Sequence, residues 1–352
     1  MGKNIKKSLI VFLICLFGCN SIITAYGDED ISGVYQEIDL IVEQMYGDVS
    51  YIVKDIIPIY DCNFNICEYV FDVGLDNVDY GYFVYNIEAN EVIKFKFDTY
   101  SGESFEQKYF GCEEITDKIA KKVDEFTYEL NDYQEGVQYV ASKHDLMDIF
   151  FDNFELVYCS YILKKEKYIP NRVQFGEDYI NKKCNKNYCC AAVAILNVLG
   201  QYKCYNTNSD SSVSNAYTDI YNMGGVKKLN EEYVMDQTKM GQVVADYAKI
   251  NKNKNIPYQS KKNPDMDFFV DAVDKKYSSI LGITSKCGGG VAGHAVSVTG
   301  YLEFTPVTHG NDKRFLAVAS GWGEIGDTEY ILYDEIDVYS KYGVKFQQTI
   351  YK

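Results

Sequence analysis

The chain has 352 residues, a formal net charge of −16 at pH 7 and three histidines. Its positively charged residues are scattered, whereas nucleic-acid-binding proteins gather theirs in a patch or stripe, so no nucleic-acid partner is expected. The length exceeds what one hydrophobic core usually serves, because cores stop growing at about 250 to 300 residues. Two domains are therefore predicted.

The first residues have the layout of a secretory signal peptide. Residues 1–7 carry three lysines, residues 9–17 are apolar, and small residues follow. Residues 1–27 are therefore predicted to be a signal peptide that directs secretion from a bacterial-type cell. Leu16–Cys19 is also a loose match to a lipoprotein cleavage box, in which Cys19 would be lipidated and would anchor the protein at the cell surface. Attachment to a membrane is expected only in that case.

Residues 28–165 are predicted to form an N-terminal α+β domain. Gly33–Tyr46 has apolar residues at helical spacing, which predicts an amphipathic helix. Tyr80–Asn86 and Glu91–Phe97 alternate in polarity around a short turn, which predicts a β-hairpin. Lys164–Arg172 concentrates charge around a proline and is predicted to be the linker to the second domain.

Residues 166–352 are predicted to form the second domain. An apolar helix is predicted over Tyr188–Tyr202, and an Asn- and Ser-rich surface loop over 206–216. Further helices are predicted over Lys228–Ala248 and Phe268–Val273. Strands are predicted after them, over Ser279–Thr284, Ala295–Tyr301, Arg314–Ser320 and Glu329–Tyr333. Helices followed by antiparallel strands indicate the α+β class.

Eleven cysteines are present, of which Cys15 and Cys19 belong to the predicted signal peptide, so nine remain. In an oxidising compartment an odd number permits up to four disulfides and leaves at least one thiol free. Alternatively, several are small buried residues in a chain that forms no disulfides. A zinc site would have to use Cys184, Cys189, Cys204 and His294, but Cys-x4-Cys-Cys is not a usual zinc-binding spacing. Neither a metal ion nor a cofactor is expected.

Two cysteines and one histidine stand where a thiol enzyme would place them. Cys189 and Cys190 lie at the N-terminal end of the predicted apolar helix, where unpaired N–H groups and the helix dipole stabilise a thiolate. His294 follows the glycine-rich run 288–293 and opens a predicted strand. An imidazole beside the thiol would complete a reactive pair. Simple core packing is the alternative interpretation of all three residues.

Three segments resemble the papain-like cysteine peptidases: Asn187–Leu199, Gly293–Tyr301 and Val318–Gly323. The resemblance covers about residues 180 to 335 and is nearest to the streptopain and bacteriocin-processing (double-glycine) branches. It implies a two-lobed domain, with a helical lobe, a twisted antiparallel sheet and a cleft between them. It also implies that the segment 28–165 is a prodomain and that the exported protein is a zymogen.

The resemblance assigns roles to residues of the second domain. Cys190 corresponds to the nucleophile and His294 to the general base and acid, with Cys189 as the alternative nucleophile. Ser320 stands where the family carries an Asn or Asp that orients the histidine. Its hydroxyl is expected to accept the hydrogen bond of the ring, although it adds no charge to stabilise an imidazolium.

Three further residues are candidates for supporting such a site. The upstream Gln that donates to the oxyanion in the family is absent here, and only Asn185 and Asn187 stand near its place. Trp322, the single tryptophan, is expected to shield the histidine from water.

The resemblance implies a secreted cysteine peptidase that acts on peptide or protein substrates. Because Ser320 departs from the family pattern, the alternative is a degenerate papain-like scaffold that serves as a secreted binding protein. Transglutaminase-like and cell-wall amidase-like domains share the order of Cys before His, but Gly321–Gly323 favours the peptidase branch.

Overall fold

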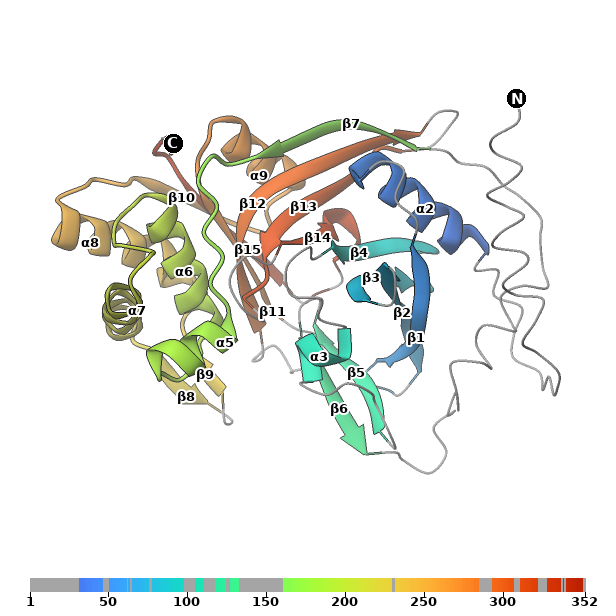
Figure 1. Cartoon of the computed structure of the whole chain (residues 1–352). Coiled ribbons are helices and arrows are strands. Elements are labelled where there is room, and N and C mark those ends of the chain that lie inside the picture. The colour runs from blue at the N-terminus through green and yellow to red at the C-terminus, as the bar shows by residue number, and fades with distance from the viewer. Residues whose placement is uncertain are drawn as a thin grey trace.

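The computed structural model describes residues 32–46, 51–61, 63, 65–75, 78–97, 105–110, 118–124, 127–132, 161–229, 232–284, 293–306, 311–321, 328–336, 338 and 340–350. These residues form an α+β fold with one large mixed sheet (Figure 1). The predicted signal peptide, Cys19 and Trp322 lie outside the described residues.

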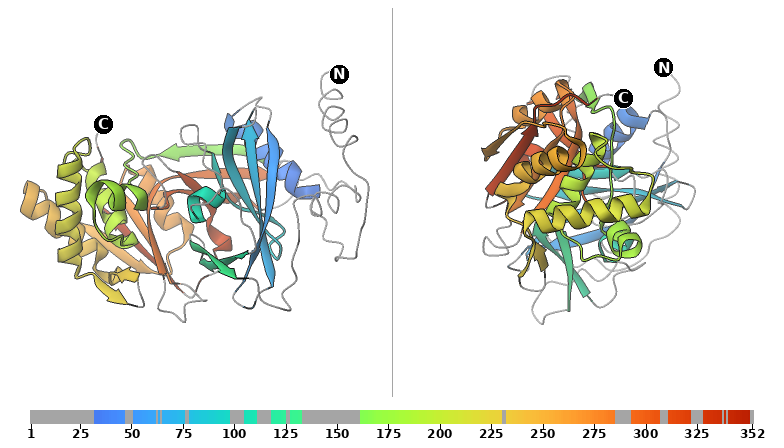
Figure 2. Two further views of the ribbon diagram at one scale, coloured as in Figure 1. Left: turned by 60° about the horizontal axis from the view of Figure 1, so that its bottom comes forward. Right: turned by 90° about the vertical axis from the view of Figure 1, so that its left-hand side faces the viewer.

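Helices gather at one end of the molecule. They are α5 (Glu177–Tyr179), which continues into a π-helical turn over Ile180–Cys184, α6 (Cys190–Gln201), α7 (Asp210–Gly224) and α8 (Met240–Lys252). Figures 1 and 2 show them at one end of the molecule, with strands β1 to β3 at the other end. A short 3-10 turn at Gln237–Lys239 leads directly into α8. Elsewhere lie α2 (Ser32–Tyr46), α3 (Phe105–Phe110), α9 (Met266–Asp274) and a short 3-10 turn at Tyr333–Glu335.

The large sheet runs through both halves of the chain. Among the described residues its strand order is β10-β15-β11-β12-β13-β14-β4-β3-β2-β1-β5-β6, and β7 pairs with β12 beside this path. The N-terminal strands are β1 (Ile52–Tyr60), β2 (Ile66–Leu75), β3 (Val78–Asn86), β4 (Glu91–Phe97), β5 (Lys118–Asp124) and β6 (Thr127–Asp132). The others are β7 (Tyr161–Tyr168), β10 (Tyr258–Lys262), β11 (Ser279–Thr284), β12 (Gly293–Pro306), β13 (Lys313–Ala319), β14 (Glu329–Leu332) and β15 (Ser340–Phe346). A separate pair joins β8 (Lys227–Leu229) to β9 (Glu232–Val234).

Two hydrophobic cores lie along this sheet. The first joins α6, α7, α8 and α9 to β11, β12, β13 and β15. The second lies over β1 to β4 and α2, and it also takes in side chains of β12, β13 and β14, namely Leu302, Phe304, Phe315, Ala317, Tyr330 and Leu332. The N-terminal strands therefore share a core with strands of the C-terminal half.

Polar contacts join the same two halves. Glu329 in β14 is fully buried and accepts hydrogen bonds from the hydroxyls of Tyr82, at 3.0 Å, and Tyr109, at 3.1 Å. Lys313 in β13 forms ion pairs with Glu37 of α2 and, at 2.6 Å, with Glu91 of β4. Burial alone would lower the pKa of Lys313, but the two carboxylates outweigh it and raise that pKa above its ordinary value. The positive charge of Lys313 in the C-terminal half is therefore held by carboxylates of the N-terminal half.

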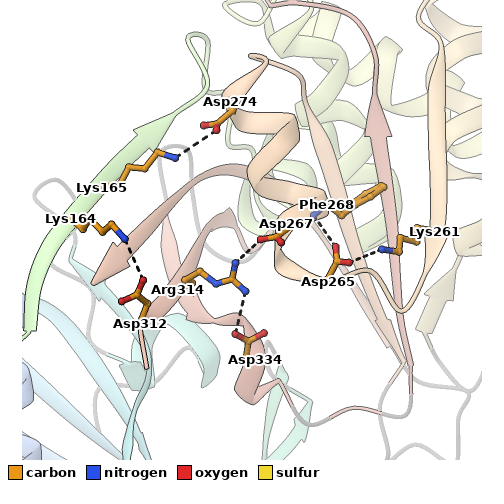
Figure 3. A network of polar contacts seen from close by, with 10 residues as sticks. All are labelled: Lys164, Lys165, Lys261, Asp265, Asp267, Phe268, Asp274, Asp312, Arg314 and Asp334. Carbon is orange, nitrogen blue, oxygen red and sulfur yellow. Dashed lines mark hydrogen bonds and ion pairs between the residues drawn. The ribbon is translucent and has the colours of Figure 1, made fainter. Parts of the chain in front are cut away.

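A second set of ion pairs lies around α9 and is more exposed (Figure 3). Lys165 of β7 pairs with Asp274 at 3.6 Å, and Arg314 of β13 pairs with Asp267 at 2.6 Å. Such exposed pairs contribute little stability, typically about 0 to 1 kcal/mol each. All of these residues belong to the C-terminal half, so the two halves are joined by the second core and by the contacts of Glu329 and Lys313.

Several predicted elements are confirmed. The helix over Gly33–Tyr46 is α2, the hairpin is β3 and β4, and the apolar helix is α6. The predicted helix over Phe268–Val273 is α9, and the predicted strands are β11 to β14.

Three predictions were wrong. The segment 206–216 is not a loop throughout, because Ser209 caps α7 and Val213, Ala216, Tyr217 and Ile220 are buried at helical spacing. Over Lys228–Ala248, two short strands precede α8, which begins only at Met240. Lys164–Arg172 is not a linker throughout, because Tyr161–Tyr168 is a strand that pairs with β12. The predicted boundary between residues 165 and 166 therefore falls inside β7.

Replacing Phe95 with alanine is expected to lower the free energy of unfolding by about 3 to 5 kcal/mol. Phe95 is fully buried, stacks on Tyr330 at 4.7 Å between ring centroids and meets the ring of Phe315 edge-on at 5.4 Å. Denaturant unfolding measures the loss. Ile250→Ala is the control, since that side chain is 73% exposed. A similar loss in both variants would contradict this account of the second core.

Candidate active site

Cys190 is the first residue of helix α6, and Cys189 is its N-cap with an extended backbone at φ −147° and ψ 110°. Every residue from Ala191 to Gln201 is buried, because the helix packs between α7, α8 and strand β12. Burial on all sides explains why its sequence, apart from Asn197 and Gln201, is apolar rather than amphipathic. The helix is thus a fixed support for a thiol at its N-terminal end.

The two adjacent thiols have different surroundings. Cys189 is 1% exposed, and burial raises the pKa of its thiol to about 11, against the opposite effect of the Ala191 and Ala192 amides. Such a thiol is almost wholly protonated at neutral pH. Cys190 is partly exposed, and its Sγ lies 4.0 Å from the carbonyl oxygen of Gly293. These surroundings favour Cys190 over Cys189 as a nucleophile.

His294 is the second residue of β12, directly after the carbonyl that Cys190 approaches. It is 5% exposed, and its backbone lies opposite Ile283 of β11. Its Nε2 lies 2.6 Å from the carbonyl oxygen of Ser320. A carbonyl oxygen only accepts hydrogen bonds, so Nε2 is the donor, and in the neutral ring Nδ1 is then the basic nitrogen.

Ser320 orients the histidine through its main chain and not through its hydroxyl. It follows the last residue of β13 and is fully buried. Within the described part of the chain its Oγ has no hydrogen-bond partner, while its carbonyl accepts from His294. The expectation that the hydroxyl accepts this bond was therefore wrong. Position 320 supplies an acceptor whatever its side chain is.

Gly321, the next residue, is buried and has a φ of +84°, a conformation that favours glycine. Its carbonyl accepts a hydrogen bond from the N–H of Glu177 at 2.7 Å. A Cβ atom at this position would lie 2.9 Å from the hydroxyl oxygen of Tyr188 and 3.9 Å from Nε2 of His294. The tip of Tyr188 and the histidine ring thus lie near the same short stretch of main chain.

The other predicted site residues do not join this arrangement. Asn185 and Asn187 are exposed, and Asn185 ends the π-helical turn in a left-handed conformation with φ 51°. The carbonyl of Asn187 accepts from the Tyr217 hydroxyl at 2.8 Å. No contact within the described ranges links either asparagine side chain to Cys190 or His294.

Sequence reasoning missed Glu177, Tyr188 and Asn197. Only Asn197 left a signal, because it is the single polar residue in the apolar run 191–199. Such a residue in a buried helix needs a hydrogen-bond partner, and that need marks it for attention.

Among the described residues, Cys184, Cys189, Cys190 and Cys204 are free thiols. In the same part of the chain, no three His, Cys, Asp or Glu side chains gather in a way that would hold a metal ion. No helix described here is long and apolar enough to cross a membrane. No protein-family model matches the sequence, and no curated protein matches it either.

Proposed function

We propose that this protein is a secreted cysteine peptidase with a papain-like arrangement, in which Cys190 is the nucleophile and His294 is the general base and acid. One observation carries the proposal. The Cys190 thiol, at a helix N-terminus, lies against the carbonyl of Gly293, and the next residue, His294, is held by the Ser320 carbonyl with Nδ1 left as its basic nitrogen. The helices at one end of the molecule pack directly against the antiparallel strands β11 and β12, an arrangement that supports the two lobes implied by the resemblance.

The proposed chemistry needs no cofactor. Nδ1 of His294 takes the proton of the Cys190 thiol, and the sulfur attacks the carbonyl carbon of a peptide bond. The tetrahedral intermediate collapses as the imidazolium returns its proton to the leaving amine, which leaves a thioester. Water, activated by the same nitrogen, then attacks the thioester and releases the carboxylic acid and the free thiol.

The departure of Ser320 from the family pattern does not weaken this proposal. A main-chain carbonyl accepts the ring N–H as an amide side chain would, so the ring keeps one tautomer. A carbonyl carries no full charge, and the imidazolium is therefore stabilised less than by a carboxylate.

Export and a zymogen form are parts of the proposal that rest on residues 1–27 and on the resemblance. The shared second core adds a condition, because cleavage between the two halves would leave the N-terminal half bound by its packing against β13 and β14. A change of activity on cleavage would then come from a local rearrangement and not from departure of the N-terminal half.

The proposal is tested by incubating the purified protein with a mixture of unrelated peptides and identifying new termini by mass spectrometry. Hydrolysis is expected, and iodoacetamide at pH 7 is expected to abolish it while modifying Cys190 and sparing the buried Cys189. Modification of Cys190 without any hydrolysis, over a broad peptide set, would favour the binding scaffold. Hydrolysis that survives full modification of Cys190 would exclude the proposed nucleophile.

A further inference from the structure

Asn197 lies on α6 about two turns beyond Cys190 and is fully buried. Its amide binds both main-chain groups of one residue: Oδ1 accepts from the N–H of Phe175 at 2.7 Å, and Nδ2 donates to the carbonyl of Phe175 at 3.1 Å. A buried amide is costly unless both ends are bonded, and here both are. Asn197 thus fixes residue 175 to the helix that carries Cys190.

The chain continues from Phe175 to the acceptor of the histidine. Two residues on, the N–H of Glu177 donates to the carbonyl of Gly321 at 2.7 Å. The peptide before Gly321 carries the Ser320 carbonyl, which accepts from His294 at 2.6 Å. A continuous run of hydrogen bonds and short main-chain steps therefore leads from α6 to the imidazole.

Tyr188 reaches the same place by a second route. It precedes Cys189 and Cys190 directly, and its hydroxyl oxygen lies against the α-carbon of Gly321, where a Cβ atom would come within 2.9 Å. Burial raises the pKa of Tyr188 well above its ordinary value, and the nearby Cys190 and Glu177 act in the same direction. The phenol therefore stays neutral and acts on Gly321 by its size and polarity.

We propose that Asn197 and Tyr188 are positioning residues that hold the Ser320–Gly321 main chain, and through it the His294 ring, in register with Cys190. A side-chain acceptor is held by its own rotamer, but a carbonyl is only as fixed as its peptide. Asn197 and Tyr188 both belong to the segment 188–197, which also carries Cys190. The Cys190 thiol and the Ser320 carbonyl that binds the His294 ring therefore move together. The catalytic meaning of this arrangement rests on the proposed function, whereas its effect on the ring does not.

The test follows the ring N–H of His294 by nitrogen-15 NMR of protein labelled at histidine. The chain has three histidines, so the spectrum is simple, and the signal missing in His294→Gln gives the assignment. The variants are Asn197→Leu, which removes both bonds at similar size, and Tyr188→Phe, which removes one oxygen. Val198→Ala is the control, because Val198 is buried on the same helix. Thermal unfolding shows that each variant is folded.

The unchanged protein is expected to show His294 protonated at Nε2 with slow exchange. In Asn197→Leu the exchange is expected to rise about tenfold, as when local opening loses one or two hydrogen bonds. Tyr188→Phe is expected to change it in the same direction, and this variant decides the matter if Asn197→Leu does not fold. Val198→Ala is expected to lower the melting temperature without changing the exchange. Exchange in both variants equal to that of Val198→Ala would overturn the proposal.

A second measurement separates this inference from the proposed function. The rate of Cys190 alkylation at pH 6, relative to the rate at pH 9, is expected to fall about tenfold in the variants whose ring exchange rises, because a displaced imidazole no longer takes the thiol proton. If exchange rises and this ratio does not change, the positioning stands and the pairing of His294 with Cys190 is wrong. If the unchanged protein already reacts like a free cysteine, the proposed function fails, and the exchange data still decide the positioning.

Discussion

Replacing Cys190 with alanine is expected to lower kcat/KM for peptide hydrolysis by on the order of 10⁴-fold or more, because the loss of a covalent nucleophile removes both chemical steps. The matched variant is Cys189→Ala. It makes the same chemical change one residue earlier, on a side chain that is 1% exposed in the first core. Cys189→Ala is expected to keep most of the activity and to lose some stability. Rates are measured on one peptide that the protein has been found to cleave.

Two results with this pair of variants would contradict the prediction. Loss of activity in Cys189→Ala, with retention in Cys190→Ala, would exchange the roles of the two residues. If both variants keep the activity of the unchanged protein, neither thiol attacks the substrate.

Removal of residues 1–160 is expected to leave a C-terminal half that does not fold as a soluble monomer. Leu302, Phe304, Phe315, Tyr330 and Leu332 are each at most 6% exposed, and all of them pack in the core shared with the N-terminal strands. Exposing such side chains costs about 1.5 to 3 kcal/mol each. Five of them together cost roughly as much as the whole net stability of a typical domain, which is about 5 to 15 kcal/mol. The carboxylate of Glu329 would also lose the hydroxyls of Tyr82 and Tyr109.

Production of residues 28–160 and 161–352 as two separate chains in one cell provides the control. Co-production is expected to restore solubility, and the two chains are expected to elute together in size-exclusion chromatography. Circular dichroism and a single cooperative thermal transition report the fold. A soluble, folded and active chain 161–352 on its own would show that the N-terminal half is a detachable prodomain after all.

The elements that sequence reasoning found are those with strong local patterns. Helix α6 is apolar except at Asn197 and Gln201, and β11, β12 and β13 are buried strands rich in branched side chains. The α7 helix was missed because its Asn- and Ser-rich start is typical of a loop, although Ser209 is a helix cap. Strand β7 was missed because its charged residues face solvent or ion-pair partners along an exposed edge.

The candidate site likewise contains some residues that the sequence marks and others that only the fold reveals. Cys190 and His294 could be named as candidates from the sequence because a thiol and an imidazole are side chains with particular chemistry. The acceptor at Ser320 was not, because it is a carbonyl group, and every residue has one. Pairing of β4 with β14 could not be predicted either, since Lys94 and Ile331 meet only through the fold.

That pairing constrains the order in which the protein folds. Strand β4 is complete early in synthesis, but its partner β14 lies near the C-terminus, with Phe95 opposite Tyr330. Until the last part of the chain arrives, β4 has an open edge beside a bulky apolar surface, the kind of edge that invites pairing with other chains. Contacts so distant in sequence also form slowly. The N-terminal strands are thus exposed to aggregation during synthesis, and the period of risk ends only when Glu329–Leu332 closes the sheet.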